Sequence, residues 1–436
     1  MAILIYNCTA VLMDDENTIL KNAFITVEGT QIAAIGTMRP IGSFEQMIDA
    51  QGGILMPGLV NAHTHLPMTL MRGYGGGCDL QTWLSEYIFP AEDKLDARAV
   101  RAGCGLALAE LIASGVTTVA DMYMFCEEIT QEVVSAGISA NIARGATLFG
   151  DHFDFETHPA CRETRDLVER WHGWGDGQIL VDACVHGEYT SHPVLWQAMS
   201  DYAAEHNLGM HVHVSETRKE QDECLARWGK TPAQILDDYG VWNTRAIAAH
   251  GVWLTDADME LFAKRGVTLV HNPVSNLKLG SGIARICAMR DAGINVALGT
   301  DGVSSNNSHD MFEEIKLASI LQNGSCLNPS AISPIEALRM ATVNGGKALG
   351  RKTGKIATGY TADLILLDCN RPHLLPQHSI LDLLAYSAHG SDVVMNMARG
   401  KIIYRDGVFL TLDLARIRME CERYALPLLF DDPYRS

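Results

Sequence analysis

LVNAHTH at residues 59–65 is a short apolar run that ends in two histidines, and it opens a regular alternation. From residue 58 to about 350, apolar runs rich in β-branched residues alternate with segments of helical pattern. Strand followed by helix, repeated over such a length, is typical of a closed parallel barrel. We predict its eight strands at Leu59–His65, Thr117–Met122, Ser139–Arg144, Ile179–His186, Gly209–Val214, Ala246–Leu254, Val267–His271 and Asn295–Gly299.

The segments on either side of this alternation are rich in short strands and turns. The candidates before it are Ala2–Thr9, Ala23–Glu28 and Gln31–Thr37, and those after it are Ala362–Asp368, Val393–Ala398 and Lys401–Tyr404. The simplest arrangement joins both ends of the chain in one small domain. We therefore predict an α/β protein in which residues 57–350 form a (β/α)8 TIM barrel. The barrel is inserted into a β-sandwich made of residues 1–56 and 351–436, which include a C-terminal tail.

The composition excludes several classes of protein. A formal net charge of −18 argues against nucleic-acid binding, because phosphate contacts need clustered lysine and arginine. No apolar run approaches a membrane span, and the N-terminus lacks the pattern of a secretory signal. The 11 cysteines show no CxxC spacing, so we expect reduced, mostly buried thiols. We predict a cytoplasmic protein with no nucleic-acid or membrane partner, and the composition leaves open whether it forms a homo-oligomer.

Imidazole and carboxylate groups occur at the predicted strand ends, where catalytic residues of TIM barrels lie. His63 and His65 are two residues apart, so both rings can point toward the barrel axis and share one metal ion. His213 ends the fifth strand and Asp301 follows the eighth. A barrel core normally excludes unpaired polar groups, so this conjunction indicates a metal site. His211, by contrast, has the position of a packed core histidine.

The ligand set also indicates how many metal ions to expect, and which. Sites with two metals need a bridging ligand, often a modified lysine on a central strand, and Ile179–His186 contains no lysine. We therefore predict a single divalent cation. Nitrogen-rich ligands suit Zn²⁺ best, and Fe²⁺ would fit the same set.

The surrounding residues favour hydrolysis without a covalent nucleophile. A bound cation would activate water, Asp301 would accept its proton, and His250 would stabilise the developing charge. Glu216, just after the fifth strand, would pass a proton to a ring nitrogen and then to a leaving amine. Neither a GxSxG elbow nor a nucleotide-binding GxGxxG or GxxxxGK[ST] motif stands out. Together these groups suit attack on a ring amidine carbon.

Several longer motifs lie along the chain: PGLVNAHTH (57–65), the HxxE of 213–216, AAHGVWL (248–254), HNPVSNLKLGSG (271–282) and GTDGVSSNN (299–307). These motifs resemble those of the amidohydrolase superfamily. Residues 66–93 and TTVADMYMF (117–125) resemble, more narrowly, the 5-methylthioadenosine/S-adenosylhomocysteine deaminase family. The resemblance covers nearly the whole chain, including GxxADLILLD at 359–368.

This resemblance implies a role for each matching position. It implies metal ligands at His63, His65, His213 and Asp301, a catalytic His250, and substrate contacts at Glu92, Arg144, His186 and Glu216. We also expect Trp83, in the loop after the first strand, to stack on the substrate or form a wall beside it, and Asp301 to contact the substrate. Glu92 would accept hydrogen bonds from a ribose diol, and Arg144 would meet a substrate carboxylate. Without the resemblance, the simplest interpretation of Glu92 is a surface charge and that of Trp83 is a core residue. Arg144 is then as consistent with a structural ion pair as with a substrate contact.

One residue departs from the family pattern, and two other functions stay open. Glu188, where the family often has proline, is either a surface residue or a contact for a cationic group of the substrate. The leading hypothesis is deamination of 5′-modified adenosines to inosine analogues and ammonia. A guanine or s-triazine hydrolase would keep the metal site but would lack the ribose and carboxylate that Glu92 and Arg144 expect. A non-catalytic assembly protein of the same fold is less compatible, because every expected ligand is present.

Overall fold

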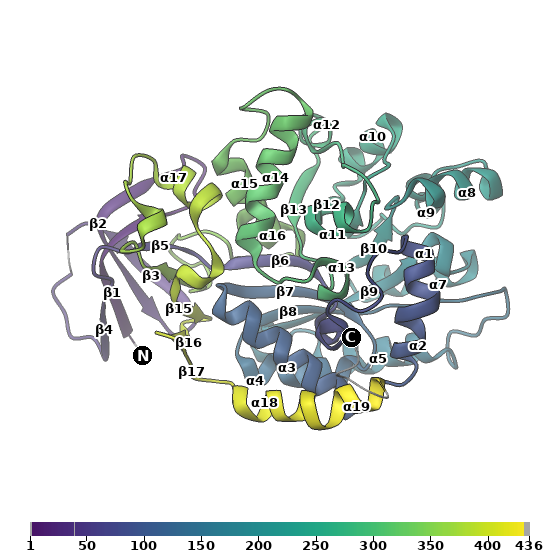
Figure 1. The fold of residues 1–436 in the computed structure, drawn as a ribbon, viewed down its shortest axis with the longest axis horizontal. Helices are drawn as coiled ribbons and strands as arrows, with labels where there is room; N and C mark the ends of the chain where they lie inside the picture. The colour runs from purple at the N-terminus through teal and green to yellow at the C-terminus, as the bar shows by residue number, and fades with distance from the viewer. Residues whose placement is uncertain (1, 39, 431–436) are drawn as a thin grey trace.

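A parallel barrel forms the larger part of the molecule, as predicted (Figure 1). The computed structural model describes residues 2–38 and 40–430. The eight barrel strands follow one another in chain order: β6 (Leu59–Thr64), β7 (Val116–Tyr123), β8 (Ser139–Arg144), β9 (Ile179–Gly187), β10 (Met210–Val214), β11 (Ala246–His250), β12 (Thr268–His271) and β13 (Asn295–Leu298). The sixth is shorter than predicted, because His250 and Gly251 both adopt positive φ angles that turn the chain out of the strand.

The two outermost strands of this sheet, β6 and β13, meet and complete the barrel. The Asn61 side chain donates a hydrogen bond to the Thr300 hydroxyl at 2.7 Å and accepts one from the Thr300 N–H at 3.0 Å. The Asp301 N–H also donates to the His63 carbonyl at 3.0 Å. These bonds hold the ends of the two strands together, so residues far apart in sequence become neighbours at the rim.

Helices surround the barrel, and several begin at recognisable signals. Asp96 caps α3, and Thr255 forms a capping box with Asp258 at the start of α10. The helices of the barrel segment are α1 (Leu80–Trp83), α2 (Phe89–Glu92), α3 (Ala97–Ala113), α4 (Cys126–Ala136), α5 (Pro159–Trp171), α6 (Trp174–Gly177), α7 (Pro193–Glu205), α8 (Arg218–Trp228), α9 (Pro232–Asp238), α10 (Asp256–Arg265), α11 (Pro273–Lys278), α12 (Ile286–Asp291), α13 (Val303–Asn306), α14 (Met311–Ser325), α15 (Pro334–Met340) and α16 (Val343–Ala348). The same segment also contains the short helical elements η1 (Leu66–Met71), η2 (Leu84–Ile88) and η3 (Glu188–Thr190).

Both ends of the chain contribute to a second sheet beside the barrel, which confirms the predicted terminal β-domain (Figure 1). Its nine strands are β1 (Ala2–Val11), β2 (Ile19–Glu28), β3 (Gln31–Gly36), β4 (Gln46–Asp49), β5 (Ile54–Pro57), β14 (Leu364–Leu367), β15 (Val393–Ala398), β16 (Lys401–Arg405) and β17 (Val408–Phe409). The sheet branches at β1, which pairs with β2 on one edge and with β4 and then β5 on the other. β14 pairs with β5, so the returning chain is attached next to the strand that leads into the barrel.

The last part of the described chain leaves this sheet and returns to the barrel. Two short helical elements, α17 (Ile380–Asp382) and η5 (Leu383–Ser387), precede β15, and η4 (Pro372–Leu374) and η6 (Gly390–Asp392) flank them. After β17, α18 (Leu414–Glu420), η7 (Cys421–Ala425) and α19 (Leu426–Leu429) run along α3 (Figure 1). Arg98 of α3 pairs with Glu420 at 2.7 Å. Within residues 2–38 and 40–430, no helix has the length and apolar character needed to cross a membrane.

Candidate metal centre and active site

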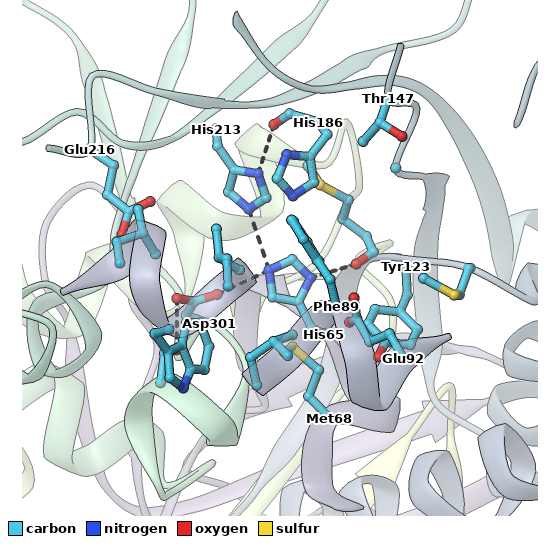
Figure 2. Close-up of a pocket in the computed structure, with 18 of the residues that line it drawn as sticks. His65, Met68, Phe89, Glu92, Tyr123, Thr147, His186, His213, Glu216 and Asp301 are labelled. Carbon is cyan, nitrogen blue, oxygen red and sulfur yellow. Dashed lines mark hydrogen bonds and ion pairs between the residues drawn. The ribbon is translucent and has the colours of Figure 1, made fainter. Parts of the chain in front are cut away.

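Imidazole and carboxylate groups from four strands converge at one rim of the barrel (Figure 2). Ligand atoms of His63, His213, His250 and Asp301 all lie within 4.8 Å of one another. His65 joins the same group, because its Nε2 atom is 3.0 Å from Asp301 Oδ1 and 3.3 Å from His213 Nε2. The histidines of β6 and β10 and the aspartate after β13 are thus close enough to share an ion.

Each of these histidines is held by a bond to its second ring nitrogen. The Nδ1 atom of His65 lies 2.5 Å from the Met122 carbonyl, and that of His213 lies 2.7 Å from the His186 carbonyl. A carbonyl only accepts, so both rings donate there through Nδ1, and their Nε2 atoms are left to face the centre of the cluster. His63 Nδ1 is bonded to His211 Nε2 at 2.8 Å. This arrangement points the Nε2 atoms inward.

The donor set fits a divalent cation. His63 Nε2 is fully buried and makes no hydrogen bond, which is costly unless an ion completes it. Burial lowers the pKa of His63 to about 4 and that of His213 well below its usual range, so both rings are neutral, as metal ligands must be. Burial opposes ionisation of Asp301, but the neighbouring His63 and His65 rings outweigh burial and hold the pKa of this carboxyl well below the usual value. Burial also opposes protonation of His65, but the Asp301 carboxylate beside it outweighs burial and raises the pKa of His65 to about 9. A cation bound there would replace that proton, so the cluster offers imidazole nitrogens together with one fixed negative charge.

A cavity of about 350 Å³ opens beside this cluster. Its polar lining includes His65, His186, His213, Glu216, His250 and Asp301 together with Glu92, Asp93 and Arg144. Apolar side chains form most of the remaining wall: Met68, Leu80, Trp83, Leu84, Ile88, Phe89, Met122, Met124, Phe149 and Leu279. Figure 2 shows Glu216 and Glu92 on opposite sides of the group formed by His65, His213 and Asp301. The space suits a flat, mostly apolar ligand with polar groups at both ends.

The comparisons with known proteins agree with this geometry. The chain matches the amidohydrolase family over residues 54–403. The chain belongs to the amidohydrolase family. A 5-methylthioadenosine/S-adenosylhomocysteine deaminase of Caldanaerobacter subterraneus subsp. tengcongensis is 41% identical, over 98% of this chain and 99% of its own length. A 5′-deoxyadenosine deaminase of Methanosarcina mazei is 39% identical, over 98% of each chain. Among solved structures, an adenosine deaminase from Xanthomonas campestris with bound zinc superposes with a TM-score of 0.93 at 31% identity, covering 98% of both chains.

Glu216 of this amidohydrolase lies next to His250, which belongs to the cluster. Both side chains are buried, and His250 Nε2 is 3.8 Å from Glu216 Oε2. Burial raises the pKa of Glu216, which favours a carboxyl group able to hold and release a proton. Two bonds fix the loop beneath it, because Glu220 accepts the N–H groups of Ser215 and Glu216 at 2.8 and 2.7 Å.

The predicted substrate-contacting residues are all part of the cavity wall. Glu92, at the end of α2, is partly buried rather than a surface charge. Trp83 is only 5% exposed and also lines the cavity, so it is both a core residue and part of the cavity wall. His186 is bonded through Nδ1 to the Thr190 hydroxyl at 2.8 Å, and burial lowers its pKa to about 3.

Glu188 has neither of the two roles considered for it. It is 2% exposed and does not line the cavity. Its carboxylate accepts bonds from Arg227 and from the Trp228 indole, both at 2.7 Å. The residue that departs from the family pattern therefore forms an ion pair with Arg227 of α8, in which the carboxylate is buried and the guanidinium is exposed. Its neighbours in sequence do not predict this partner.

Some residues that orient the site were not identified from the sequence. Ser275 and Ser305 donate hydrogen bonds to Asp301 Oδ2 at 2.6 and 2.9 Å, and Asn276 Oδ1 is 2.9 Å from His250 Nδ1. They lie inside HNPVSNLKLGSG and GTDGVSSNN, so the motifs contained the signal. The sequence did not show that these two motifs lie next to each other in the folded chain.

Replacing Ser275 with alanine should weaken metal binding about 10-fold to 100-fold, because Asp301 loses one of the donors that orient it. Competition with a chromogenic chelator measures the change. Ser325→Ala is the matched control, because this exposed serine bonds only within α14, to the Leu321 carbonyl. Equal metal affinity in both variants would mean that Ser305 alone suffices to hold the carboxylate.

Proposed function

We propose that this amidohydrolase is a zinc-dependent deaminase of 5′-modified adenosines, which releases ammonia and leaves the inosine analogue. The observation that carries this proposal is a single cavity with the His and Asp cluster beside Glu216 on one side and Glu92 on the other. Relatives named as deaminases of 5-methylthioadenosine, S-adenosylhomocysteine and 5′-deoxyadenosine match almost the full chain and support the choice of substrate. Zinc is proposed over iron because of the nitrogen-rich donors and the zinc of the Xanthomonas campestris neighbour.

The proposed ligands of the ion are His63, His65, His213 and Asp301. Zinc bound there supplies Lewis acidity, which makes a water molecule a better nucleophile near neutral pH. Asp301 carries the fixed charge that accepts a proton, and its Oδ2 atom is already committed to Ser275 and Ser305. Its Oδ1 atom faces the ring nitrogens of His63 and His65, so this oxygen would bind the ion and keep the carboxylate beside the water that gives up its proton.

Glu216 and His250 would act on the purine ring itself. The buried Glu216 carboxyl would protonate a ring nitrogen next to the attacked carbon. After regaining the proton that Asp301 takes from the attacking water, it would hand a proton to the departing amine. The hydroxyl proton lost as the ring carbonyl forms would then restore the Glu216 carboxyl. The His250 ring, fixed through Nδ1 near Asn276, directs Nε2 toward the cavity, where it would stabilise charge at the attacked carbon. His186, neutral and held by Thr190, would contribute a hydrogen bond from the adjoining wall.

Glu92 would recognise the ribose, and this role has a pH signature. Withdrawal from solvent raises the pKa of Glu92 from 4.5 to about 6. The Glu92 carboxylate, which would accept hydrogen bonds from both ribose hydroxyls, is therefore mostly ionised above this pKa and becomes protonated as the pH falls through it. We expect kcat/KM to decline on this acidic side for adenosines and the decline to be absent in Glu92→Gln. An analogue without the 2′ and 3′ hydroxyls is the control, and the same decline with that analogue would contradict a contact between Glu92 and the diol.

The experiment that tests the proposal is ammonia release from a panel of compounds, with added zinc and with a chelator. Adenosine, 5′-deoxyadenosine, 5-methylthioadenosine and S-adenosylhomocysteine form one group. Guanine and s-triazines form the other, because they lack the ribose that Glu92 would hold. Turnover confined to the first group and abolished by the chelator supports the proposal. Turnover of guanine or a triazine alone would replace it with the second hydrolase function, and none in either group would contradict both.

A further inference from the structure

Arg144, at the end of β8, is already committed to a carboxylate of this chain. Its Nε atom donates to Glu163 Oε2 at 2.6 Å, and its Nη1 atom donates to the Gly145 carbonyl. Glu163 is itself fixed, because its other oxygen accepts the Cys126 N–H at 2.6 Å. The two side chains are 19% and 27% exposed, so water screens this pair only in part. Two of the three guanidinium nitrogens of Arg144 are therefore already bonded within the chain, and the Glu163 carboxylate already balances its charge.

The charges around Arg144 are mainly negative. Glu92 and Asp93 line the same cavity as Arg144, and Glu163 adds a third carboxylate at the guanidinium. The guanidinium is thus bonded to one carboxylate and shares its cavity with two more. The neighbouring wall is apolar and comes from Met122, Met124 and Phe149.

This part of the wall lies across the barrel from the residues that would act on the base. Arg144 belongs to β8 and the two methionines flank the end of β7, whereas His250 ends β11 and Asp301 follows β13. A nucleoside with its base at the metal cluster and its ribose at Glu92 would direct its 5′ substituent toward Arg144 and these apolar side chains. The chemistry of this wall consequently bears on which 5′ substituents are accepted.

We propose that this wall selects adenosines with an uncharged 5′ substituent, and that Glu163 is a specificity-determining residue because it occupies Arg144. The proposal rests on the proposed deaminase function. A carboxylate brought here would have to compete with Glu163 for Arg144, or would lose its water without gaining a free partner. A hydrogen, hydroxyl or methylthio group loses nothing comparable and gains contact with the apolar wall.

The decisive substrates are two adenosines that differ only in charge. One is 5′-butylthioadenosine, and the other is the analogue whose terminal methyl group is replaced by a carboxylate. We expect kcat/KM to be at least about tenfold higher for the uncharged compound. S-adenosylhomocysteine, which carries an ammonium beside its carboxylate, should fall between the two. Equal kcat/KM for the pair, or a preference for the carboxylate, would overturn the proposal.

Glu163→Gln tests the residue itself. The amide oxygen can still accept the Cys126 N–H, but the negative charge beside Arg144 is gone. We expect the preference for the uncharged compound to shrink about tenfold, mainly through KM. Glu156→Gln is the matched control, because Glu156 is 71% exposed, pairs with Arg165 and does not line the cavity. An unchanged preference in Glu163→Gln would show that Glu163 does not determine which 5′ substituent is accepted.

The outcomes separate this inference from the proposed function. If no adenosine is deaminated, the proposed function fails. If adenosines are deaminated but the carboxylate is accepted as well as the methyl group, only the specificity proposal fails. The wild-type comparison decides this even where Glu163→Gln does not fold, and melting temperature and zinc content show whether it does.

Discussion

Glu216→Gln should retain the metal and lose between about 100-fold and 10,000-fold in kcat, the range that a positioned acid–base group contributes. Glutamine has nearly the same shape, and its backbone N–H still reaches Glu220. It cannot exchange a proton with a purine ring nitrogen at neutral pH. Burial raises the pKa of the native carboxyl, which is the property the amide removes. Steady-state ammonia release and metal analysis on the same preparation measure both quantities.

The control for this prediction is Glu205→Gln at the exposed end of α7, which makes the same chemical change away from the cavity. It should leave kcat unchanged. KM in Glu216→Gln should change much less than kcat, because the carboxyl acts chiefly on the reacting atoms. An unaltered kcat with full metal content would mean that the proton travels by another route, and Asp301 would be the remaining candidate.

The barrel was predictable because its signal is local and repeated. Each strand is a short apolar run, and the predicted starts and ends lie within a few residues of those observed. The exception, the strand ending at His250, shows what the pattern lacks: positive φ angles at residues 250 and 251 turn the chain although the sequence stays apolar. The branching of the terminal sheet at β1 depends on pairing with β4 and β5, whose paired residues lie 43 to 45 positions further along the chain, and it has no local sequence signal.

The site was predictable to the extent that its residues sit at strand ends. The spacing of His63 and His65 predicts a shared direction, and the strand order brings His213 and Asp301 to the same rim. Partners supplied by a helix were not predictable. Glu163 of α5 pairs with Arg144, and Arg227 of α8 pairs with Glu188. In both cases the partner is 19 or more residues away in sequence. A charged residue therefore reveals its availability to a ligand only after its partners are known.

His213→Ala should abolish metal binding and activity together. His213 Nε2 is 3.3 Å from His65 Nε2, and the ring is fixed through Nδ1 to the His186 carbonyl. Alanine removes a donor at the centre of the cluster, and three remaining groups cannot restore it from their fixed positions. We expect metal content near zero after gel filtration and no ammonia release above background. Zinc added back should restore chelated wild-type protein but not the variant.

This loss must be distinguished from loss of the fold. The ring is buried, so truncation to alanine leaves a cavity and lowers stability by a few kcal/mol. A barrel closed at the seam by Asn61 and Thr300 should tolerate that change, and circular dichroism with a cooperative melt verifies it. His206→Ala, at the exposed end of α7, is the control and should keep both metal and turnover. A folded His213→Ala protein with full zinc content would remove β10 from the metal site, and the donor set would then have to be completed by His250, whose ligand atom lies within 4.8 Å of those of His63 and Asp301.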